Sequence, residues 1–568
     1  MDESSEKLPA SDPNGNDGAL PVAADDAGFR VGQRVHAMGN PRRTGTVRYV
    51  GAVEGHAGAW VGVDWDDGEG KHDGSVNGVR YFAAAGERSA SFVRSKNLSA
   101  GISFIEALHL RYRGDSTKEE EDEMYILSTS KKRVSIQLVG KNKVQEKLKH
   151  FEELRGASVS YLGVSFVGSS DEINALVPNL EELDLTGNLL SKWQDIGSLC
   201  DALPALGVLN LTNNFMEHHV EELPLLKRIH TLVLNNCGMT WKEVEMLKES
   251  LTAVEELHLM ANKLRTIMSI FFMQPAPSVP VTAFVQGFDN LRLLNLEDNC
   301  IDSWDEILKF SYLRSLEQLH LNKNKLKHIY YPANHPSPGT LDDNYMQDTS
   351  CKPFEKLQCL LLGHNEIEDL ASIDSLNSFP RLMDIRLSEN PIVDLAHGGV
   401  PRFVLVARLA KAKILNGSEV SPRERKESEI RYVRLVMAKM QSDDSEEVKQ
   451  LHPRFAELKA LHGIEDEKPS CGISGPQKMA SGLLCVTLKC VGASIGEKQP
   501  LTKKIPPTTT VGKLKVLCES FFKLKGIRLR LFLQEEGSPL PVLLNDDMAP
   551  LMDLGMGTEA TILVDEES

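Results

Sequence analysis

Several features are missing from this chain, and each absence excludes a class of protein. No apolar run reaches about 18 residues, so no membrane-spanning helix is expected. The nine cysteines form no Cys-x-x-Cys pair, which fits a reducing compartment better than a disulfide framework and gives no metal-binding pattern. Basic residues are outnumbered, 64 against 80, and the resulting net charge of −16 argues against nonspecific nucleic-acid binding.

The first 27 residues are acidic and polar, without the basic flank and apolar run of a secretory signal. We therefore expect residues 1–27 to be a disordered tail and the protein to be cytoplasmic. A chain of 568 residues is too long for one core, so three or four domains are expected.

The stretch GEGKHDGSVNGVRYF, residues 68–82, sets one lysine among glycines. A phosphate-binding loop is excluded because Trp65 and His72 stand where that motif needs glycine and Ser or Thr. The remaining interpretation is a tight loop whose backbone amides and single ammonium receive a carboxylate. Residues 28–105 carry ten lysines and arginines against seven acids, so this segment could attract an acidic partner.

Short β-branched and aromatic runs separated by glycine turns fill residues 31–98 and predict a small β-barrel. TGTVRYVG, WVGVDWD, GKHDG and GVRYF together resemble a CAP-Gly domain, here assigned to 28–105. The family usually has Asn at the place of His72. The resemblance implies that the loop receives the Glu-Glu-Tyr end of α-tubulin, or a similar acidic-aromatic tail. The candidate tail-binding residues are Trp60, Gly70, Lys71, His72, Asp73, Gly74, Phe82 and Phe92.

Each of these residues also has a purely structural interpretation. Trp60, Phe82 and Phe92 could be core residues of the barrel, and the two glycines could only supply a turn. A lysine on its own is usually a solvated charge, and the flanking pattern is what favours a binding role for Lys71.

The middle of the chain repeats the template L-x-x-L-x-L-x-x-N, which predicts an α/β leucine-rich-repeat solenoid over 155–440 including a C-terminal cap. The last template position is occupied by Asn188, Asn214, Cys237, Asn262, Asn299, Asn324, Asn365 and Asn390. A weaker match from Val159 to Val167 is interpreted as an N-terminal half-repeat. Two proline-rich insertions, 267–288 and 330–355, are either partner-binding loops or loops that fold back on the solenoid.

Stacked repeats form a parallel sheet whose exposed columns can bind a protein. The candidate residues for a tubulin body on this sheet are Asp184, Asn210, His258, Asn295, His320 and Arg386. His258 and His320 fall in one column, so zinc is conceivable, but exposed polar residues on a binding surface are the favoured interpretation. We expect no catalytic group, no metal and no cofactor, because no nucleophile-base or metal constellation stands out.

The remaining segments complete the organisation. Ser421, Pro422 and Glu424 predict a capped helix start in the solenoid cap. Residues 106–154 and 441–480 are predicted linkers, the second with one short helical stretch. Residues 481–568 resemble a ubiquitin-like β-grasp that lacks a terminal Gly-Gly, so we expect an integral domain rather than a modifier.

CAP-Gly barrel, leucine-rich repeats and ubiquitin-like domain, in this order, make a multidomain α+β chain that resembles the tubulin-folding cofactor E family. The resemblance implies a non-enzymatic, cytoskeleton-associated chaperone that captures α-tubulin and acts with cofactors D and C and a small GTPase in assembly and disassembly of the αβ-tubulin dimer. The proteasome is a further candidate partner, whereas nucleic acid and membrane are not. Two alternatives stay open: a microtubule-binding CAP-Gly tether and a ubiquitin-pathway adaptor.

Overall fold

The computed structural model describes most of the chain from residue 28 to residue 566. The described segments are 28–113, 125–127, 133–135, 150–218, 223–267, 284–332, 352–395, 398–442, 445–464, 483–492, 498–506, 508–524, 527–534, 541–544, 547–548, 551, 554 and 559–566. The predicted tail 1–27 and most of the two insertions lie outside these residues.

The first module is a small antiparallel β-barrel. Its strands are β1 (Arg34–Ala37), β2 (Asn40–Val53), β3 (His56–Trp65), β6 (Ala90–Val93) and β7 (Leu98–Ser99), in the order β6-β3-β2-β1-β7. A separate hairpin joins β4 (Ser75–Val76) to β5 (Val79–Arg80), and a short helix η1 (Ser95–Asn97) precedes β7. The alternating apolar residues meet in one core, which contains Val35, Val47, Val61, Val63, Trp65 and Leu98.

The chain remains structured directly after the barrel. Strand β8 (Ile102–Ser103) pairs in parallel with β12 (Val164–Phe166), and helix α1 (Phe104–Tyr112) follows it. Ser103 caps α1 through a capping box with Glu106. The predicted linker 106–154 therefore begins inside a helix that buries Phe104, Ala107 and Leu108, and it also contains the pair β9 (Tyr125–Leu127) and β10 (Arg133–Ser135).

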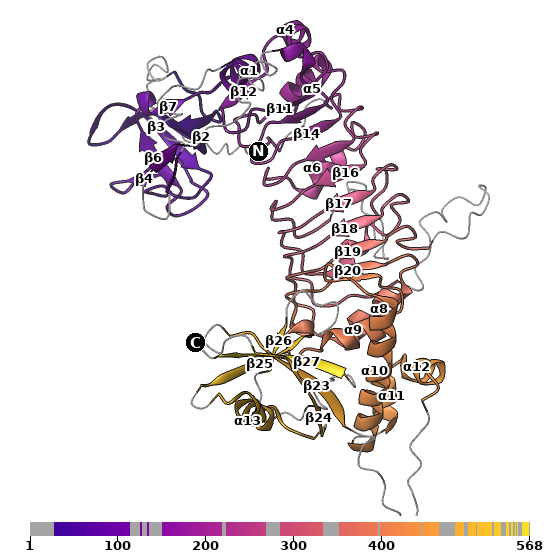
Figure 1. Ribbon diagram of the computed structural model, residues 1–568. Helices are drawn as coiled ribbons and strands as arrows, with labels where there is room; N and C mark the ends of the chain where they lie inside the picture. The colour runs from indigo at the N-terminus through magenta and orange to yellow at the C-terminus, as the bar shows by residue number, and fades with distance from the viewer. Residues whose placement is uncertain are drawn as a thin grey trace, which may run out of the picture. The chain divides into compact units, whose positions relative to one another are not determined.

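The leucine-rich repeats form one parallel sheet, and Figure 1 shows its strands stacked in chain order. The strands are β11 (Gly156–Ser158), β13 (Glu182–Asp184), β14 (Val208–Asn210), β15 (Thr231–Val233), β16 (Glu256–His258), β17 (Leu293–Asn295), β18 (Gln318–His320), β19 (Cys359–Leu361) and β20 (Asp384–Arg386). The middle residue of each strand points into the core because side chains alternate along a strand; it is leucine in seven of these strands, Ala157 in β11 and Ile385 in β20.

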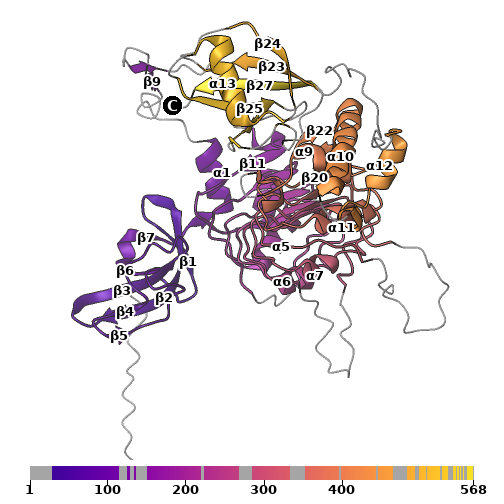
Figure 2. The ribbon, with the colours of Figure 1, turned by 90° about the horizontal axis from the view of Figure 1, so that it is seen from below.

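Short helices return the chain from one strand to the next, except the first of them, which precedes β11. They are η2 (Phe151–Glu153), α4 (Ser170–Leu176), α5 (Trp193–Ala202), α6 (Trp241–Met246), α7 (Trp304–Leu308), α8 (Leu370–Ser375), η4 (Leu376–Ser378) and η5 (Pro391–Val393). Figure 2 looks along the stack and shows α6 and α7 on one side of the coil.

The template asparagines hold neighbouring turns together. Asn299 donates from Nδ2 to the carbonyls of Leu259 and Leu296, each at 3.0 Å, and its Oδ1 accepts from the amide of Leu264 at 3.0 Å. Such buried side chains satisfy the backbone groups that the tight turns leave unpaired. Where the repeat has Cys237 instead, the thiol donates to the carbonyl of Leu211 at 3.1 Å.

The first repeat lies five residues earlier than predicted. Strand β11 neighbours β13, and the amides of Glu181 and Glu182 both donate to the carbonyl of Arg155, at 2.7 and 2.9 Å. Leu154 and Ala157 therefore take the places of the template leucines, and both are buried. The half-repeat predicted from Val159 to Val167 was wrong in register. The chain has Ala157 at the second leucine position of the true repeat, so the template does not match the sequence there.

The cap contains α9 (Arg402–Arg408), β21 (Ile414–Leu415), β22 (Ser418–Glu419) and α10 (Pro422–Ser442), followed by α11 (Ser445–Leu451) and α12 (Phe455–Leu461). The predicted start of α10 is confirmed in part, since the Ser421 hydroxyl accepts from the Glu424 amide at 3.1 Å. The Glu424 carboxylate accepts from Arg402 at 2.7 Å.

Residues 445–464 are not the linker that the sequence predicts. Val448, Phe455 and Leu458 are buried in one core with Tyr432 and Val433 of α10. The helices α11 and α12 are therefore part of the cap.

The C-terminal module is a β-grasp. Its strands are β23 (Leu484–Cys490), β24 (Leu501–Ile505), β25 (Leu529–Gln534), β26 (Val542–Leu543) and β27 (Glu559–Glu566), in the order β24-β23-β27-β25-β26, with helix α13 (Val511–Phe522) packed on the sheet. Helix α13 buries Val511, Leu514, Cys518 and Phe522, whereas Phe521 is exposed.

Candidate functional site

The glycine loop is fastened to the barrel by its own backbone. The amides of Lys71 and His72 both donate to the carbonyl of Ala90 in β6, at 2.6 and 3.0 Å, and the amide of Ala90 donates back to His72 at 2.9 Å. These amides are therefore used inside the fold. These two amides are not available to a carboxylate, so the predicted carboxylate contact would depend on the Lys71 ammonium and on other amides of the loop.

The two signature glycines permit close packing. A Cβ atom on Gly70 would lie 2.3 Å from the carbonyl oxygen of Ala90. Gly74 has a φ of +92°, and a Cβ there would lie 2.2 Å from the carbonyl oxygen of Phe82. Both positions require glycine so that the loop can pack against the backbone of Ala90 and Phe82, and this requirement does not depend on a ligand.

Asp73 shapes the loop rather than adding free charge to it. Its carboxylate accepts from the amide of Ser75 at 3.1 Å and from the guanidinium of Arg80 at 2.6 Å. The Ser75 hydrogen bond, with help from Arg80, holds the pKa of Asp73 below its usual range. Lys71 is exposed and forms no ion pair within the described segments, so its charge is available to a ligand.

An aromatic cluster lies beside the loop, centred on Phe92. The ring of Phe92 lies 5.6 Å from Phe82, 5.3 Å from Tyr81, 6.0 Å from Tyr49 and 5.7 Å from His72. All five side chains are partly exposed. An edge-to-face cluster of this kind offers an apolar surface for an aromatic side chain next to the Lys71 ammonium.

Trp60 lies apart from the aromatic cluster, whereas His72 belongs to it. Trp60 stacks under the guanidinium of Arg94 at 3.8 Å and meets His56 at 5.8 Å, so its ring contacts do not include Phe92. His72 joins the cluster, and burial, followed by the charge of Lys71, lowers its pKa. At neutral pH His72 is therefore an uncharged partner of Phe92.

The six residues predicted to contact a tubulin body share one column of the solenoid sheet. The strand register aligns Asp184 with Asn210, His258 with Asn295, and Asn295 with His320, while Arg386 ends the same column. Val233 and Leu361 complete the column, and the sequence-based list omitted them.

These residues differ in what they offer a partner. Asn295 is 7% exposed, so the expectation that it is an exposed contact is wrong. Its Oδ1 accepts from the amide of Glu297 at 3.0 Å, and its Nδ2 lies 3.4 Å from Nδ1 of His258. Asn210 likewise accepts from the amide of Thr212 at 3.0 Å. Both asparagines therefore bind their own backbone.

The surroundings of the two histidines in the column favour their neutral form. Burial is the main cause that lowers the pKa of His258 and of His320, and the neighbouring His258 lowers the pKa of His320 further. In the described part of the chain, no cluster of three or more His, Cys, Asp or Glu side chains is arranged to hold a metal ion. Within the same residues, no helix is long and apolar enough to cross a bilayer.

Comparison with known proteins agrees with these modules. Residues 31–98 match the CAP-Gly domain family. Over 550 residues, covering 97% of this chain and 100% of the relative, the sequence is 58% identical to "Tubulin-folding cofactor E" of Arabidopsis thaliana. The chain belongs to the tubulin-folding cofactor E family. A more distant relative, "Tubulin-specific chaperone E" of Rattus norvegicus, is 29% identical and aligns over 92% of this chain and 95% of its own length.

Two solved structures resemble single modules. The C-terminal ubiquitin-like domain of mouse tubulin-specific chaperone e is 26% identical over 16% of this chain and 96% of that chain, with a TM-score of 0.15. The CAP-Gly domain of a human kinesin-like protein is 32% identical over 17% of this chain and 90% of that chain, with a TM-score of 0.12.

Sequence reasoning missed Tyr49 and Tyr81 in the loop site of this family member. Tyr81 immediately precedes Phe82 in the quoted motif and Tyr49 lies in TGTVRYVG, so both were within the segments that carried the CAP-Gly resemblance. Their mutual ring contact of 5.1 Å depends on how β2 lies against the loop, which the sequence alone does not give.

Proposed function

We propose that this protein is a tubulin-folding chaperone that captures α-tubulin and acts with other tubulin cofactors in assembly and disassembly of the αβ-tubulin dimer. The observation that carries the proposal is the full-length similarity to a protein named tubulin-folding cofactor E. The proposed partners are α-tubulin, cofactors D and C with a small GTPase, and the proteasome. The protein acts without catalysis, in the cytoplasm and in association with the cytoskeleton.

The proposed mechanism is bivalent capture. The acidic tail of α-tubulin binds at Lys71, and its terminal aromatic ring packs on the cluster around Phe92. The folded body of tubulin contacts the exposed face of the solenoid sheet, where His320 and Arg386 lie in one column. Two weak contacts on one chain give a higher avidity than either alone if the chain between them spans both sites.

The direct test adds the purified protein to native αβ-tubulin and measures the remaining dimer by size-exclusion chromatography. A chaperone of this family is expected to reduce the amount of dimer. Co-sedimentation with stabilised microtubules and an unchanged amount of dimer would instead favour a CAP-Gly tether. A complex that forms only with proteasomes would favour a ubiquitin-pathway adaptor.

Substitution of Lys71 tests the tail contact. A hydrogen bond to a charged group contributes about 1.5 to 3 kcal/mol, and because Lys71 is exposed we expect the lower end for Lys71→Ala, a loss of about tenfold in affinity for a peptide ending Glu-Glu-Tyr. The matched control is Lys96→Ala, which removes another exposed lysine of the barrel. Equal affinities of wild type and Lys71→Ala at low salt, measured by calorimetry, would contradict the assignment.

A further inference from the structure

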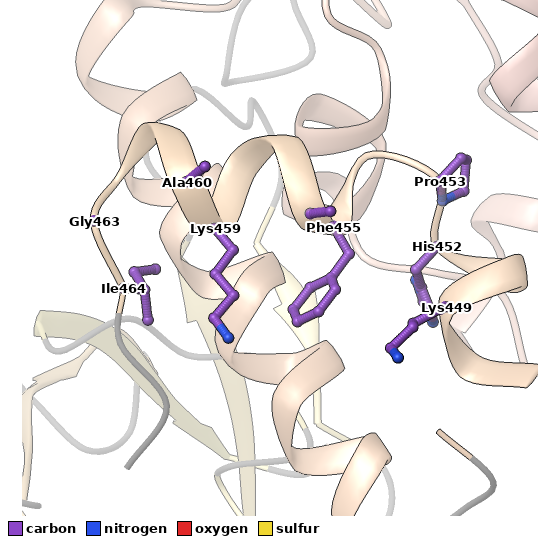
Figure 3. Close-up of a pocket in the computed structure, with 9 residues that line it drawn as sticks. Lys449, His452, Pro453, Phe455, Lys459, Ala460, Gly463 and Ile464 are labelled. Carbon is purple, nitrogen blue, oxygen red and sulfur yellow. The ribbon is translucent and has the colours of Figure 1, made fainter. Parts of the chain in front are cut away.

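The cavity along α11 and α12, drawn in Figure 3, is part of the fold of the cap. Of its two lysines, Lys449 pairs with Glu446 at 2.6 Å, and Lys459 lies over the ring of Phe455, 5.9 Å from its centre. Phe455 is 7% exposed because it packs into the core of the cap. The charged and aromatic groups of this cavity are therefore engaged within the cap.

A different cavity lies where the last repeats meet the start of α10, and we call it the repeat-end cavity. It has a volume of about 770 Å³, and its lining comes from the residues that enter β19, β20 and β21, from the turn after α9 and from the first turn of α10. Among the described residues that line it are four cations, Arg381, Lys411, Lys413 and Arg425, and no carboxylate. The lining is therefore positively charged.

Two of these four cations are held by the protein itself. The ammonium of Lys411 donates to two backbone carbonyls, at 2.8 and 2.9 Å. The guanidinium of Arg425 donates to the carbonyl of Val406 at 3.0 Å and lies 3.9 Å from the carboxylate of Glu429. Lys411 and Arg425 therefore fix the wall of the cavity, and the charge of Arg425 is partly neutralised.

Arg381 and Lys413 are the cations that remain for a ligand. Both side chains are exposed, and within the described segments neither forms an ion pair or a side-chain hydrogen bond. Their charges therefore face the cavity and water without a carboxylate partner in this part of the chain.

The same edge of the solenoid sheet treats its other charges differently. The amide of Glu317 donates to the carbonyl of Arg292 in the preceding repeat, and the two side chains form an ion pair at 3.1 Å. Lys413 occupies the equivalent position, since its amide donates to the carbonyl of Met383 at 2.8 Å, but Met383 has no charge. The pairing between neighbouring repeats is therefore absent at Lys413.

The rest of the lining suits a polypeptide. Pro380 and Met383 are half-buried and Ala410 is exposed, so they supply carbon surface between the charges. Gln358 is half-buried, and its side-chain amide can both donate to and accept from a peptide group. Neighbouring strands of a sheet lie about 5 Å apart, so two carboxylates of one short extended segment can reach the cations that precede β20 and β21.

We propose that the repeat-end cavity binds an extended acidic segment of a partner protein, with carboxylates on Arg381 and Lys413 and peptide groups on Gln358. Charge-assisted hydrogen bonds between carboxylates and these cations stabilise the complex. A nucleic acid fits less well, because the net charge of −16 repels a chain of phosphates and the described lining offers no aromatic ring for base stacking. This site lies outside both contacts of the proposed bivalent capture.

The test uses the full chain with Lys71→Glu, which repels carboxylates from the glycine loop. The probe is fluorescein-labelled hexaglutamate with an amidated end, and binding is followed by fluorescence anisotropy at low salt. Saturable binding is expected, and it should weaken as salt rises because the two cations are exposed. Hexaglutamine and a hexathymidine oligonucleotide are the ligand controls, and each should bind at least about tenfold more weakly.

Two kinds of variant locate the binding. Arg381→Glu with Lys413→Glu reverses both charges, and Ala410→Trp covers the cavity from an exposed position without a change of charge. Each should weaken hexaglutamate binding at least about tenfold. The matched control is Lys263→Glu with Lys325→Glu, which makes the same change of charge at exposed positions of the repeats outside the cavity and should leave the affinity unchanged.

The outcomes decide the site and the class of its ligand. Absence of saturable hexaglutamate binding, or an affinity that the control variant lowers as much as the cavity variants do, would overturn the proposal. Oligonucleotide binding as tight as that of hexaglutamate would overturn the assignment to an acidic polypeptide. The tubulin-dimer assay on wild-type protein is independent of these results, because the probe contains no tubulin sequence.

Discussion

A buried ion pair joins the last repeats to the cap, and the loss of stability should depend on which of its two partners is substituted. Arg408 is 1% exposed, and its guanidinium binds Asp374 through Nε at 3.0 Å and Nη2 at 2.6 Å. Nη2 also donates to the carbonyl of Leu451 at 2.7 Å. Asp374 is 23% exposed, so water can reach the carboxylate but not the guanidinium.

The magnitudes follow from that difference. Asp374→Ala leaves a buried positive charge without its partner, and such a change costs about 3 to 5 kcal/mol. Arg408→Met fills the space with an apolar chain, and the exposed edge of Asp374 becomes hydrated, so the cost is mainly the lost hydrogen bond of the Leu451 carbonyl, about 1 to 3 kcal/mol. We therefore expect Asp374→Ala to destabilise the cap more than Arg408→Met does.

Hydrogen exchange measured by mass spectrometry is the suitable assay, because a multidomain chain has no single free energy of unfolding whereas local opening of α9 and α10 can be followed directly. Glu427→Ala is the control, since it breaks an exposed pair with Arg423 at 3.0 Å and should cost less than about 1 kcal/mol. An equal or reversed order for Asp374→Ala and Arg408→Met would refute the reasoning.

Three further predictions concern the buried asparagines of the repeats, the glycine loop and the cap. Asn299→Ala should raise hydrogen exchange in β16 and β17 by the equivalent of about 3 kcal/mol, because it leaves buried backbone groups unpaired; unchanged protection would contradict this. Gly74→Ala should abolish peptide binding to the loop. Gly78→Ala has a similar φ of +82° but nothing within 4 Å of the new Cβ, so it should reduce the peptide affinity less. Equal peptide affinities of the two variants would show that the loop relieves the clash at Gly74. Between its ordinary pKa and about 4, His452 stays neutral in the folded cap and takes up a proton in the unfolded chain. Hydrogen exchange should therefore show that the cap loses stability as pH falls through that range, and His452→Gln should flatten this dependence of stability on pH. Identical pH dependence in wild type and variant would exclude His452 as the cause.

The repeat pattern and the module order could be predicted from the sequence by itself. The leucine template works because a strand alternates its side chains and each repeat has to bury the same face against the next, so Leu183 and Leu209 take equivalent buried places without knowledge of the rest of the fold. The signature GKHDG similarly predicts the glycine loop. The structure gives the physical reason for its glycines, because a Cβ atom on Gly70 or Gly74 would overlap with backbone atoms of the neighbouring segments.

Tertiary structure decided what no local pattern records. The amides of Lys71 and His72 are unavailable because Ala90, distant in sequence, accepts from both, and Tyr49 joins the aromatic cluster because β2 lies beside β3. The same holds for the cap, where Phe455 appears in a charged stretch that reads as a linker and is buried because α10 supplies the opposite wall. Contacts between segments far apart in the chain depend on packing. The sequence shows which residue stands at each position but not which distant residue it will contact.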